Sequence, residues 1–405
     1  MIPKYLDFTY QEGKSIHFAI TGSIAFFKVL ELIRNLIKRG SSVSCSLTKA
    51  AREFVTPLTF KALGCDPVQF DMFSLSETYS HLYPGVDPDI FVVAPATANI
   101  IAKIAHGIAD DLVSTQLLAY NKKILVAPAM NPRMYNAPQT QKNIQTLKDM
   151  GIEIIFPETG DVACGEKGTG RLADILYIYF RILKAIIPQD MDGQKVLITM
   201  GPTREFFDPV RFWSNPSSGK MGAALAVAAW LRGAKVTCIS GPTDVWLPND
   251  IEVIDVVSAE QMFNETLSRW KDSNIGILCA AVCDFRPKNL HSQKLKKDSI
   301  KSSLIIEFEK NPDILAKLGN LKTTNQILIG FAAETDQNFK ELAIEKIKRK
   351  NLDWIVANKI NEREVGFGAD TNEVVIIDKY GEIQPISKMS KSDVAWRILD
   401  LVNKK

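Results

Sequence analysis

Short apolar runs rich in β-branched residues alternate with segments of helical periodicity along the whole sequence. Such a run predicts a strand buried on both faces, as in a parallel sheet that helices cover on either side. The chain is therefore predicted to have an α/β fold. In the first half, strands are expected at Ile16–Thr21, Val43–Thr48, Ile90–Pro95, Ile124–Pro128 and Glu153–Pro157, with a helix over Lys28–Arg39.

The same pattern restarts after the turn-rich segment 188–193, Pro-Gln-Asp-Met-Asp-Gly, which is typical of a linker. A chain of 405 residues is also too long for one compact core. We therefore predict two Rossmann-like domains, over residues 1–190 and 191–405, the second doubly wound. Its strands are expected at Lys195–Met200, Lys235–Ser240, Ile251–Val256, Ile275–Ala281, Gln326–Ala332 and Asp353–Ala357, with a helix over 220–232 and a hairpin of Glu373–Asp378 and Glu382–Ile386.

Charge and composition narrow the class of partner. The chain carries 49 basic and 46 acidic residues, so nothing indicates a surface for nucleic acid or membrane. No apolar run reaches the roughly 18 residues that a membrane helix needs, and the N-terminus lacks the apolar core of a signal peptide. The six cysteines have no framework spacing, and Cys279 and Cys283 are expected to be buried thiols. We expect a cytoplasmic protein with reduced thiols.

In the first half, Gly22, Pro95 and Pro128 fall at the predicted carboxyl ends of strands, where parallel sheets bind their ligands. Thr21-Gly22-Ser23 closes one strand and opens a helix, an arrangement that suits a phosphate group but is also common in plain tight turns. Taken singly, His81, Asn131 and Cys164 have equally plain interpretations as a loop histidine, a turn former and an inert thiol.

Together these segments form a pattern over residues 14–184 that resembles the flavin-dependent cysteine decarboxylases. The matching motifs are Gly22-Ser-Ile-Ala25, Ala94-Pro-Ala-Thr-Ala-Asn99, Gly107-Ile-Ala-Asp-Asp-Leu112, Pro128-Ala-Met-Asn-Pro-Arg-Met134 and Ala163-Cys-Gly165. The resemblance implies a flavodoxin-like, FMN-binding domain. In the coenzyme A branch of that family, 4′-phosphopantothenoylcysteine is converted to 4′-phosphopantetheine. Oxidation of the substrate thiol to a thioaldehyde provides the electron sink for decarboxylation.

The resemblance also implies a role for individual residues. His81 would act as acid and base in the oxidative half, Asn131 would hold the substrate carboxylate, and Cys164 would help to reduce the enethiol intermediate. Met134 would lie on the same substrate loop as Asn131. The residues implied to bind FMN are Gly22, Ser23, Ile24, Thr48, Ala96, Thr97, Asn99 and Met130.

Two further Gly-rich turns open the second half. Gly201-Pro-Thr-Arg-Glu205 follows a predicted strand, and Ser217-Ser-Gly-Lys-Met-Gly222 opens a helix. Both could cradle a phosphate, although neither is a Walker P-loop and either alone fits an ordinary Rossmann turn. The polar, Lys- and Ser-rich segment Lys288–Ser303 is predicted to be a mobile flap.

With Ala280-Ala-Val-Cys-Asp284, Lys294-Leu-Lys-Lys297, Lys310-Asn-Pro-Asp313, Gly330-Phe-Ala-Ala-Glu-Thr335 and Ala357-Asn358, these turns resemble the bacterial phosphopantothenate–cysteine ligases over residues 193–401. Such enzymes activate 4′-phosphopantothenate with CTP as an acyl-cytidylate, which the amine of cysteine then attacks. Asn215 would polarise the carboxylate and Lys294 would assist turnover of the cytidylate, with Asp284 a weaker candidate for Mg²⁺. The other residues implied to bind substrate are Leu278, Cys279, Ala280, Asp284, Pro312, Asp313, Ile314, Leu315, Phe331, Lys346 and Lys350.

Both activities occur fused in this order in a bifunctional bacterial enzyme family, which implies a homo-oligomer: trimeric decarboxylase units joined through dimeric ligase domains into a dodecamer. Phe206-Phe207 and Cys283-Asp-Phe285 depart from the usual ligase residues, and we expect changes of fit without loss of chemistry. Two alternatives remain: a decarboxylase that acts on a peptide cysteine, and a non-catalytic relative that binds protein partners.

Overall fold

The computed structural model describes residues 2–73, 81–82, 88–161, 165–296, 304–334, 339–359 and 368–403. The chain forms two compact units that divide between Ile187 and Pro188. Pro3–Phe8 belongs to the second unit, although it begins the chain. In the described part of the chain, every helix is too short or too polar to cross a membrane.

The first unit is built on a six-stranded parallel sheet of order β3-β2-β1-β4-β5-β6. The direction of winding reverses between β1 and β4, and without the two-residue β3 the order is that of flavodoxin-like folds. The predicted parallel sheet is thus confirmed, with each expected strand present and β3 added. The strands are β1 (Ser15–Ile20), β2 (Ser42–Leu47), β3 (Val68–Gln69), β4 (Ile90–Ala96), β5 (Lys123–Pro128) and β6 (Glu153–Ile154).

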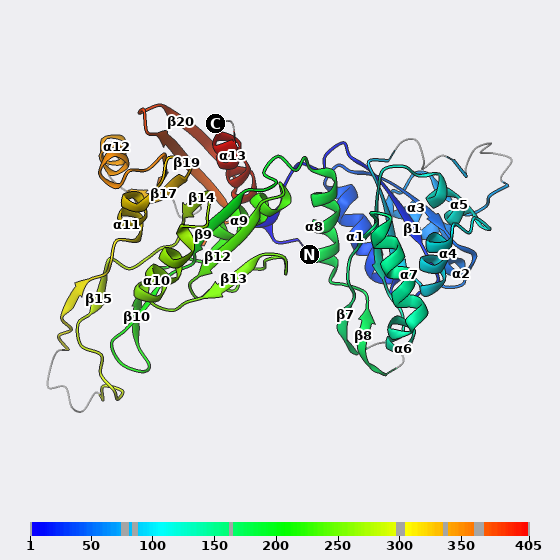
Figure 1. Ribbon diagram of the computed structural model, residues 1–405, viewed down its shortest axis with the longest axis horizontal. Helices are drawn as coiled ribbons and strands as arrows, with labels where there is room; N and C mark the ends of the chain where they lie inside the picture. The colour runs from blue at the N-terminus through cyan, green and yellow to red at the C-terminus, as the bar shows by residue number, and fades with distance from the viewer. Residues whose placement is uncertain are drawn as a thin grey trace. The chain divides into compact units, whose positions relative to one another are not determined.

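Helices cover both faces of this sheet (Figure 1). α1 and α8 pack against each other and against β4, whereas α4 and α7 pack together over the opposite face of the same strand. A hairpin of β7 (Glu158–Asp161) and β8 (Lys167–Arg171) stands outside the sheet, and its polar sequence did not predict it. The helices are α1 (Phe26–Lys38), α2 (Lys49–Arg52), α3 (Pro57–Leu63), α4 (Ala98–His106), α5 (Leu112–Ala119), α6 (Pro132–Asn136), α7 (Pro138–Asp149) and α8 (Ile175–Ile186).

The second unit contains an eight-stranded sheet of order β13-β12-β9-β14-β17-β18-β19-β20. The first six strands are parallel and reverse their winding between β9 and β14, as in a Rossmann fold, while β19 and β20 add the predicted antiparallel hairpin. The strands are β9 (Lys195–Met200), β12 (Lys235–Ser240), β13 (Glu252–Asp255), β14 (Ile275–Leu278), β17 (Ile327–Glu334), β18 (Trp354–Lys359), β19 (Thr371–Asp378) and β20 (Ile383–Ser390).

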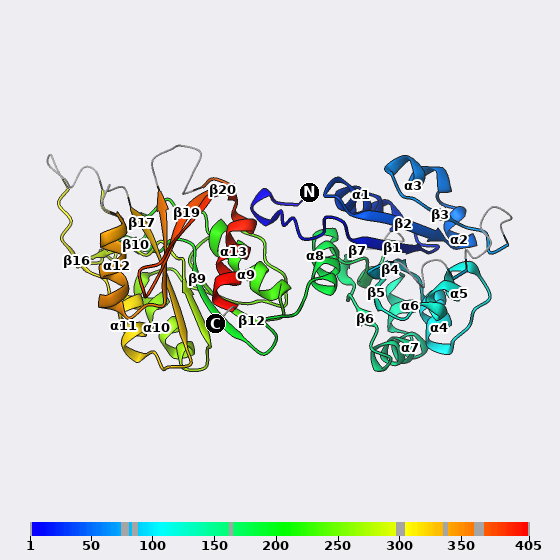
Figure 2. The same cartoon turned by 90° about the horizontal axis from the view of Figure 1, so that it is seen from above.

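Helix α9 is almost wholly buried in this unit, with every residue from Met221 to Leu231 buried. It packs on β9 and β12 and lies beside α13 (Figure 2), which explains why it is apolar on all sides. The short helix η1 contacts α9 and α13 as well, and the Trp246 amide donates to the Tyr5 hydroxyl at 3.0 Å. The helices are η1 (Lys4–Leu6), α9 (Lys220–Leu231), α10 (Ala259–Trp270), α11 (Ile314–Leu321), α12 (Phe339–Lys350) and α13 (Lys391–Asn403).

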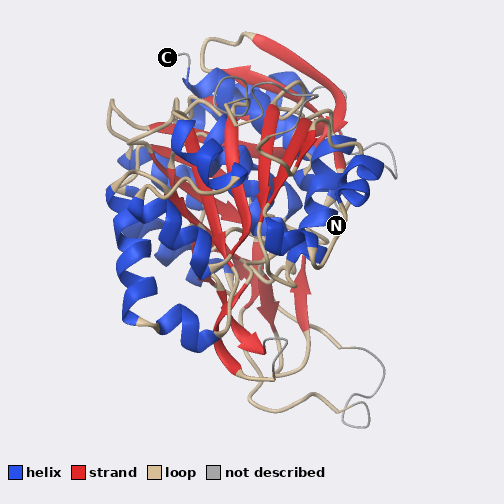
Figure 3. Ribbon diagram, turned by 90° about the vertical axis from the view of Figure 1, so that its right-hand side faces the viewer, coloured by secondary structure: helices blue, strands red, loops and turns tan. Residues whose placement is uncertain are grey.

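Two small antiparallel ladders extend from the second sheet, β10 (Arg204–Phe206) with β11 (Phe212–Ser214), and β15 (Phe285–Pro287) with β16 (Phe308–Lys310). The β15–β16 ladder projects beyond the helices in Figures 1 and 3. It leads into the segment expected to be a flap. Of that segment, residues 288–296 are described and residues 297–303 lie outside the described part of the chain.

One fully buried histidine lies in the core of the first unit. His17 on β1 is fully buried, with Nδ1 at 2.8 Å from Ser44 Oγ, Nε2 at 3.0 Å from Ser46 Oγ, and its ring against Phe91. Burial lowers the pKa of His17 from 6.5 to about 3 because the charged imidazolium would be desolvated.

This shift predicts a pH-dependent stability of the first unit. Between about pH 6.5 and pH 3 the unfolded chain binds the proton and the folded chain does not, so the free energy of unfolding falls as the pH falls, by up to about 1.4 kcal/mol per pH unit. His17→Gln should remove this contribution. Urea unfolding followed by pulse proteolysis at pH 7 and pH 5 measures it, and an equal acid dependence in both proteins would contradict the prediction.

Candidate active sites

The first candidate site lies where the carboxyl ends of β1, β2, β4 and β5 meet. A Cβ atom at Gly22 would lie 2.6 Å from the Cβ of Ala50, so the turn after β1 accommodates only glycine. The Thr21 hydroxyl donates to the Pro95 carbonyl at 2.6 Å and accepts from the Thr97 amide at 3.1 Å. These contacts hold the turns after β1 and β4 together at the point where the strand order reverses.

A cavity of about 470 Å³ opens beside this turn, within the size range of small-molecule sites. It brings together four residues that the sequence implied for FMN or substrate, namely Ser23, Ile24, Met130 and Asn131. The remaining lining residues are Ala25, Phe27, Lys28, Ala129, Asp161, Gly170, Arg171 and Leu172.

The β7–β8 hairpin forms one wall of this cavity, and the sequence did not predict it. The Met130 amide donates to the Gly170 carbonyl at 2.9 Å, and a Cβ atom at Gly170 would lie 2.3 Å from the Met130 carbonyl oxygen. Gly170 also has a φ of +154°, in the region that favours glycine. Gly168-Thr-Gly170 was the only local signal for this close approach. Cys164 lies between β7 and β8 in the sequence, outside the described residues.

Hydrogen bonds to its neighbours hold the side chain of Asn131 in place. Its Oδ1 accepts from the Arg133 amide at 2.8 Å, which caps α6, and its Nδ2 donates to Glu166 Oε2 at 3.0 Å. Glu166 is paired in turn with Arg133 at 2.8 Å. The amide is therefore oriented by its neighbours while it lines the cavity. Asn131 is thus the turn former that one interpretation of the sequence expected, and it also lines the cavity.

Other implied residues of the first unit lie along the same sheet edge without lining the cavity. Thr48 caps α2 and Thr97 caps α4, through their hydroxyl oxygens, and Ala96 accepts from the Ala129 amide at 2.9 Å. Asn99 is exposed on α4. In α6, Met134 is exposed. His81 is half-buried and stands between undescribed segments, and it does not belong to the described cavity lining.

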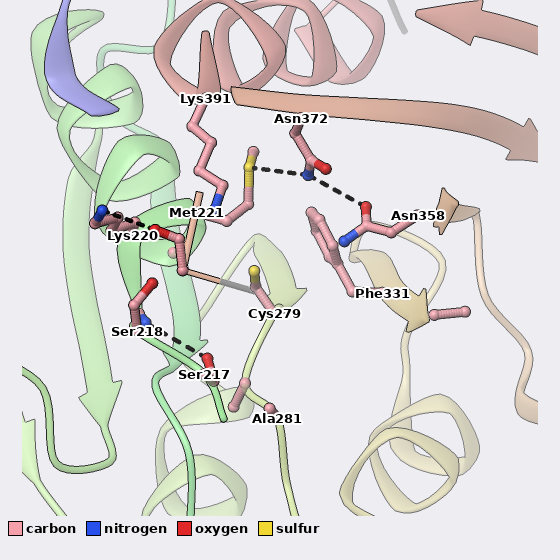
Figure 4. Close-up of a pocket in the computed structure, with 15 residues that line it drawn as sticks. Ser217, Ser218, Lys220, Met221, Cys279, Ala281, Phe331, Asn358, Asn372 and Lys391 are labelled. Carbon is pink, nitrogen blue, oxygen red and sulfur yellow. Dashed lines mark hydrogen bonds between the residues drawn. The ribbon is translucent and has the colours of Figure 1, made fainter. Parts of the chain in front are cut away.

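The second candidate site is a cavity of about 110 Å³ at the carboxyl ends of β14, β17 and β18 (Figure 4). Its volume is below that of a nucleotide pocket and suits one compact group of a larger substrate. Of the implied residues, Cys279, Ala280 and Phe331 line it. The other lining residues are Ser217, Ser218, Gly219, Lys220, Met221, Gly222, Ala281, Ala332, Asn358, Gly368, Asn372 and Lys391.

One wall of this cavity is the beginning of α9. A Cβ atom at Gly222 would lie 2.4 Å from the Cβ of Met200, and one at Gly219 would lie 2.6 Å from Thr243 Cγ2. Gly222 allows α9 to pack closely on β9, and Gly219 allows the turn before α9 to lie against the loop that follows β12. The first backbone amides of α9, with the hydroxyls of Ser217 and Ser218, thus lie at the cavity. Amides at a helix N-terminus attract anions.

The opposite wall comes from the C-terminal hairpin and α13, and sequence reasoning missed it. Lys391 is buried, and its Nζ donates to the Ala369 carbonyl at 2.6 Å. Burial lowers the pKa of Lys391 to about 8. Asn372 Nδ2 donates to Asn358 Oδ1 at 3.3 Å, and Figure 4 shows both amides facing the cavity. A lysine that begins a helix carries no local sign that it enters a site.

Of the two cysteines that the sequence predicted to be buried, Cys283 is buried, whereas Cys279 is half-buried because it lines the cavity. Burial raises the pKa of Cys279 to about 12 and raises that of Cys283 as well. The two thiols thus remain protonated at neutral pH. In the described residues, Cys45, Cys65, Cys238, Cys279 and Cys283 are all free of disulfides.

Asn215 lies beside this cavity, directly after β11. Its Nδ2 donates to the carbonyls of Ala281 and Val282, each at 3.2 Å, so the side chain is held against the chain that leaves β14. Asp284 and Lys294 are exposed. Within the described ranges, no three His, Cys, Asp or Glu side chains gather closely enough to hold a metal ion.

The remaining implied substrate residues lie around α11 and α12. Asp313 caps α11 and forms an ion pair with Lys350 at 2.8 Å. Partial desolvation would raise the pKa of its carboxyl, but the contact with Lys350 lowers it. Leu278 and Ile314 belong to the hydrophobic core, and Leu315 packs against it. Pro312 precedes α11, and Lys346 lies one helical turn before Lys350 on α12.

Two doubly wound units, each with a cavity where its strand order reverses, define a protein of two fused Rossmann-like domains. Residues 8–186 match the family described as Flavoprotein, and residues 191–405 match the DNA/pantothenate metabolism flavoprotein C-terminal domain.

The relatives extend over both units. The chain is 43% identical over 394 residues to the Coenzyme A biosynthesis bifunctional protein CoaBC of Haemophilus influenzae, and 42% identical over 393 residues to that of Bacillus subtilis. Each match covers 96% of both proteins. A solved structure of the C-terminal domain of a CoaBC protein is 38% identical, with a TM-score of 0.46, and covers 53% of this chain and 97% of that one. This chain belongs to the family of bifunctional coenzyme A biosynthesis proteins.

Gly170→Ala should detach the β7–β8 hairpin from the loop that carries Met130, because the new methyl group would overlap the Met130 carbonyl. We expect the free energy of unfolding of the first unit to fall by about 2 kcal/mol or more. The purified protein should also contain less flavin. Gly160→Ala on the facing strand is the matched control, since its Cβ would lie 3.4 Å from the nearest atom, the end of Arg171. Equal behaviour of the two variants in urea unfolding would contradict this account.

Proposed function

We propose that this chain catalyses two successive steps of coenzyme A biosynthesis. The second unit ligates cysteine to 4′-phosphopantothenate with CTP, and the first unit decarboxylates the product, 4′-phosphopantothenoylcysteine, to 4′-phosphopantetheine with FMN. The observation that carries the proposal is the similarity to bifunctional proteins over 96% of the chain, with a cavity at the switch point of each unit.

The first site fits FMN. The glycine-only turn at Gly22, followed by the Ser23 hydroxyl, would hold the phosphate, and Ile24 and Met130 would lie along the ring. Thr48, Ala96, Thr97 and Asn99 would complete the site along the same sheet edge. When bound, FMN supplies the two-electron oxidation and reduction that the side chains cannot perform.

The protein side chains would orient the substrate and move protons. The amide of Asn131 is oriented by Glu166 and Arg133, which suits it to hold the substrate carboxylate. His81 would take and return the proton of the oxidative half, and Cys164 would serve the reductive half. Met134 would contact the substrate from α6.

The second site would activate a carboxylate and then transfer it to an amine. Asn215 would polarise the carboxylate of 4′-phosphopantothenate, and the amides and hydroxyls at the start of α9 would bind an anionic group of a substrate. Lys294 would assist attack of the cysteine amine on the acyl-cytidylate. The nucleotide would contact Leu278, Cys279, Ala280, Asp284, Pro312, Asp313, Ile314, Leu315, Phe331, Lys346 and Lys350 through side chain or backbone.

Mg²⁺ would be held mainly by the triphosphate, with Asp284 as a protein ligand. Magnesium keeps several waters and is commonly bound through one or two carboxylates and substrate phosphates. That coordination agrees with a site that offers one exposed carboxylate instead of a cluster.

We further propose that the chain works in the cytoplasm as a homo-oligomer. Its free thiols agree with a reducing compartment. Trimers of the first unit, linked by dimers of the second, would form a dodecamer. Light scattering of the purified protein measures this mass directly.

The test of the function is mass spectrometry of purified protein incubated with 4′-phosphopantothenate, cysteine, CTP and Mg²⁺. The expected product is 4′-phosphopantetheine. Phosphopantothenoylcysteine alone would leave ligation supported and refute decarboxylation, and the absence of both products would refute the proposal. A peptide ending in cysteine, supplied separately, should remain unchanged.

Asn215→Ala should slow ligation by about 10²–10³-fold, the usual cost of removing one positioned hydrogen-bond donor. Decarboxylation of supplied 4′-phosphopantothenoylcysteine should continue at the wild-type rate, because Asn215 belongs to the other unit. Loss of both reactions would indicate misfolding instead.

Cys164→Ser should retain bound flavin and accumulate a species two hydrogens lighter than 4′-phosphopantetheine, because the hydroxyl cannot replace the thiol in the reductive half. Mass spectrometry of the reaction distinguishes the two products. Ordinary product formation by this variant would remove Cys164 from the mechanism.

A further inference from the structure

A fully buried carboxylate joins the turn between β10 and β11 to the segment that carries Lys294. Asp208 is 0% exposed. Its Oδ1 accepts from the amides of Val210 and Arg211, each at 2.8 Å, and its Oδ2 accepts from the Leu295 amide at 3.2 Å. One side chain thus connects two parts of the chain that are 87 residues apart.

Two further hydrogen bonds join the same segments. Arg211 Nη2 donates to the Leu295 carbonyl at 3.2 Å, and the His291 amide donates to the Phe207 carbonyl at 3.0 Å. Leu295 therefore has both its amide and its carbonyl bound by the β10–β11 turn. Residues 291–296 contain no helix or strand, so these contacts substitute for regular secondary structure there.

The charge of Asp208 makes these contacts strong. Burial would raise the pKa of the Asp208 carboxyl, but the three backbone amides and Arg211 outweigh it and leave the pKa below 3.8. The group is therefore an anion at neutral pH, and hydrogen bonds to a charged acceptor are stronger than neutral ones. A buried anion that lost the Leu295 amide would remain desolvated and less fully paired.

A purely structural role accounts for only part of this arrangement. An aspartate that accepts from the amides two and three residues ahead makes an ordinary turn, and one carboxylate oxygen suffices for it. The bond from Leu295 to the other oxygen is not needed for that turn. The β10–β11 hairpin also carries Asn215 directly after β11, so it connects the two residues implied for ligation.

We propose that Asp208 is a positioning residue for ligation, which fixes the backbone at Leu295 and thereby sets the place of Lys294 relative to Asn215. The proposal rests on the proposed ligase function. It requires Asp208 to act through Lys294, so removing Asp208 should matter only while Lys294 is present.

The test is a double-mutant cycle on CMP release from CTP, 4′-phosphopantothenate and cysteine. Asp208→Asn preserves the shape and removes the charge and one acceptor. We expect kcat to fall by about tenfold or more with the KM for CTP little changed, because nucleotide contacts are untouched. In the Lys294→Gln background, the same substitution should have little further effect.

Asp353→Asn is the matched control. Asp353 is also buried and also accepts a backbone amide, that of Leu328 at 2.9 Å, while pairing with Lys322 at 2.8 Å. This variant should leave kcat near the wild-type value. Amide hydrogen exchange of a peptide covering residues 288–296 should accelerate in Asp208→Asn and stay unchanged in Asp353→Asn.

Additive losses in the double mutant, or an equal loss of kcat in Asp353→Asn, would overturn the proposal. If the second unit of Asp208→Asn fails to fold, shown by loss of its urea-unfolding transition, Arg211→Lys decides, since it removes the bond to the Leu295 carbonyl and must also depend on Lys294. Wild-type protein that releases no CMP would refute the ligase function itself, whereas normal turnover by Asp208→Asn would refute only this inference.

Discussion

Each unit depends on one contact so close that only glycine fits there. In the first unit it involves the turn after β1, and in the second unit it involves helix α9. A Cβ atom added at Gly22 would lie 2.6 Å from the Cβ of Ala50, and one added at Gly222 would lie 2.4 Å from the Cβ of Met200. In each unit this contact lies at the strand where the winding of the sheet reverses. Because helices on either side leave in opposite directions there, a crevice opens at the carboxyl edge, and the glycine turns bring backbone amides into it.

Around this shared framework, each unit gains its specific site from a hairpin that stands outside the main sheet. The β7–β8 hairpin closes one side of the first cavity by pairing Gly170 with Met130. In the second unit, the β10–β11 hairpin holds Asn215 at its base and Asp208 at its turn. The sheets therefore supply stability and a common location, while the hairpins place the side chains that would distinguish one reaction from the other.

Much of the fold followed from local pattern. One strand was predicted to run from Ile275 to Ala281, whereas β14 ends at Leu278. The Ala281 amide nevertheless donates to the Gly201 carbonyl at 2.9 Å. The β7–β8 hairpin was missed because its strands are polar and lack clear alternation, and β10–β11 because each of its strands has only three residues. Among site residues, Ser23, Ile24, Met130 and Asn131 meet in one cavity, whereas Lys391 enters the other from a helix far along the chain.

The sequence by itself determined the two α/β sheets, the glycine turns at their strand ends and the motifs that identify the family, because hydrophobic periodicity and turn chemistry are properties of neighbouring residues. Only the tertiary structure decided that Pro3–Phe8 packs with the second unit, that Lys391 is buried at a cavity wall, and that Asp208 binds the Leu295 amide. Each of these contacts joins residues that are distant in the chain. No local period encodes such pairings, which form when the sheets bring separate segments together.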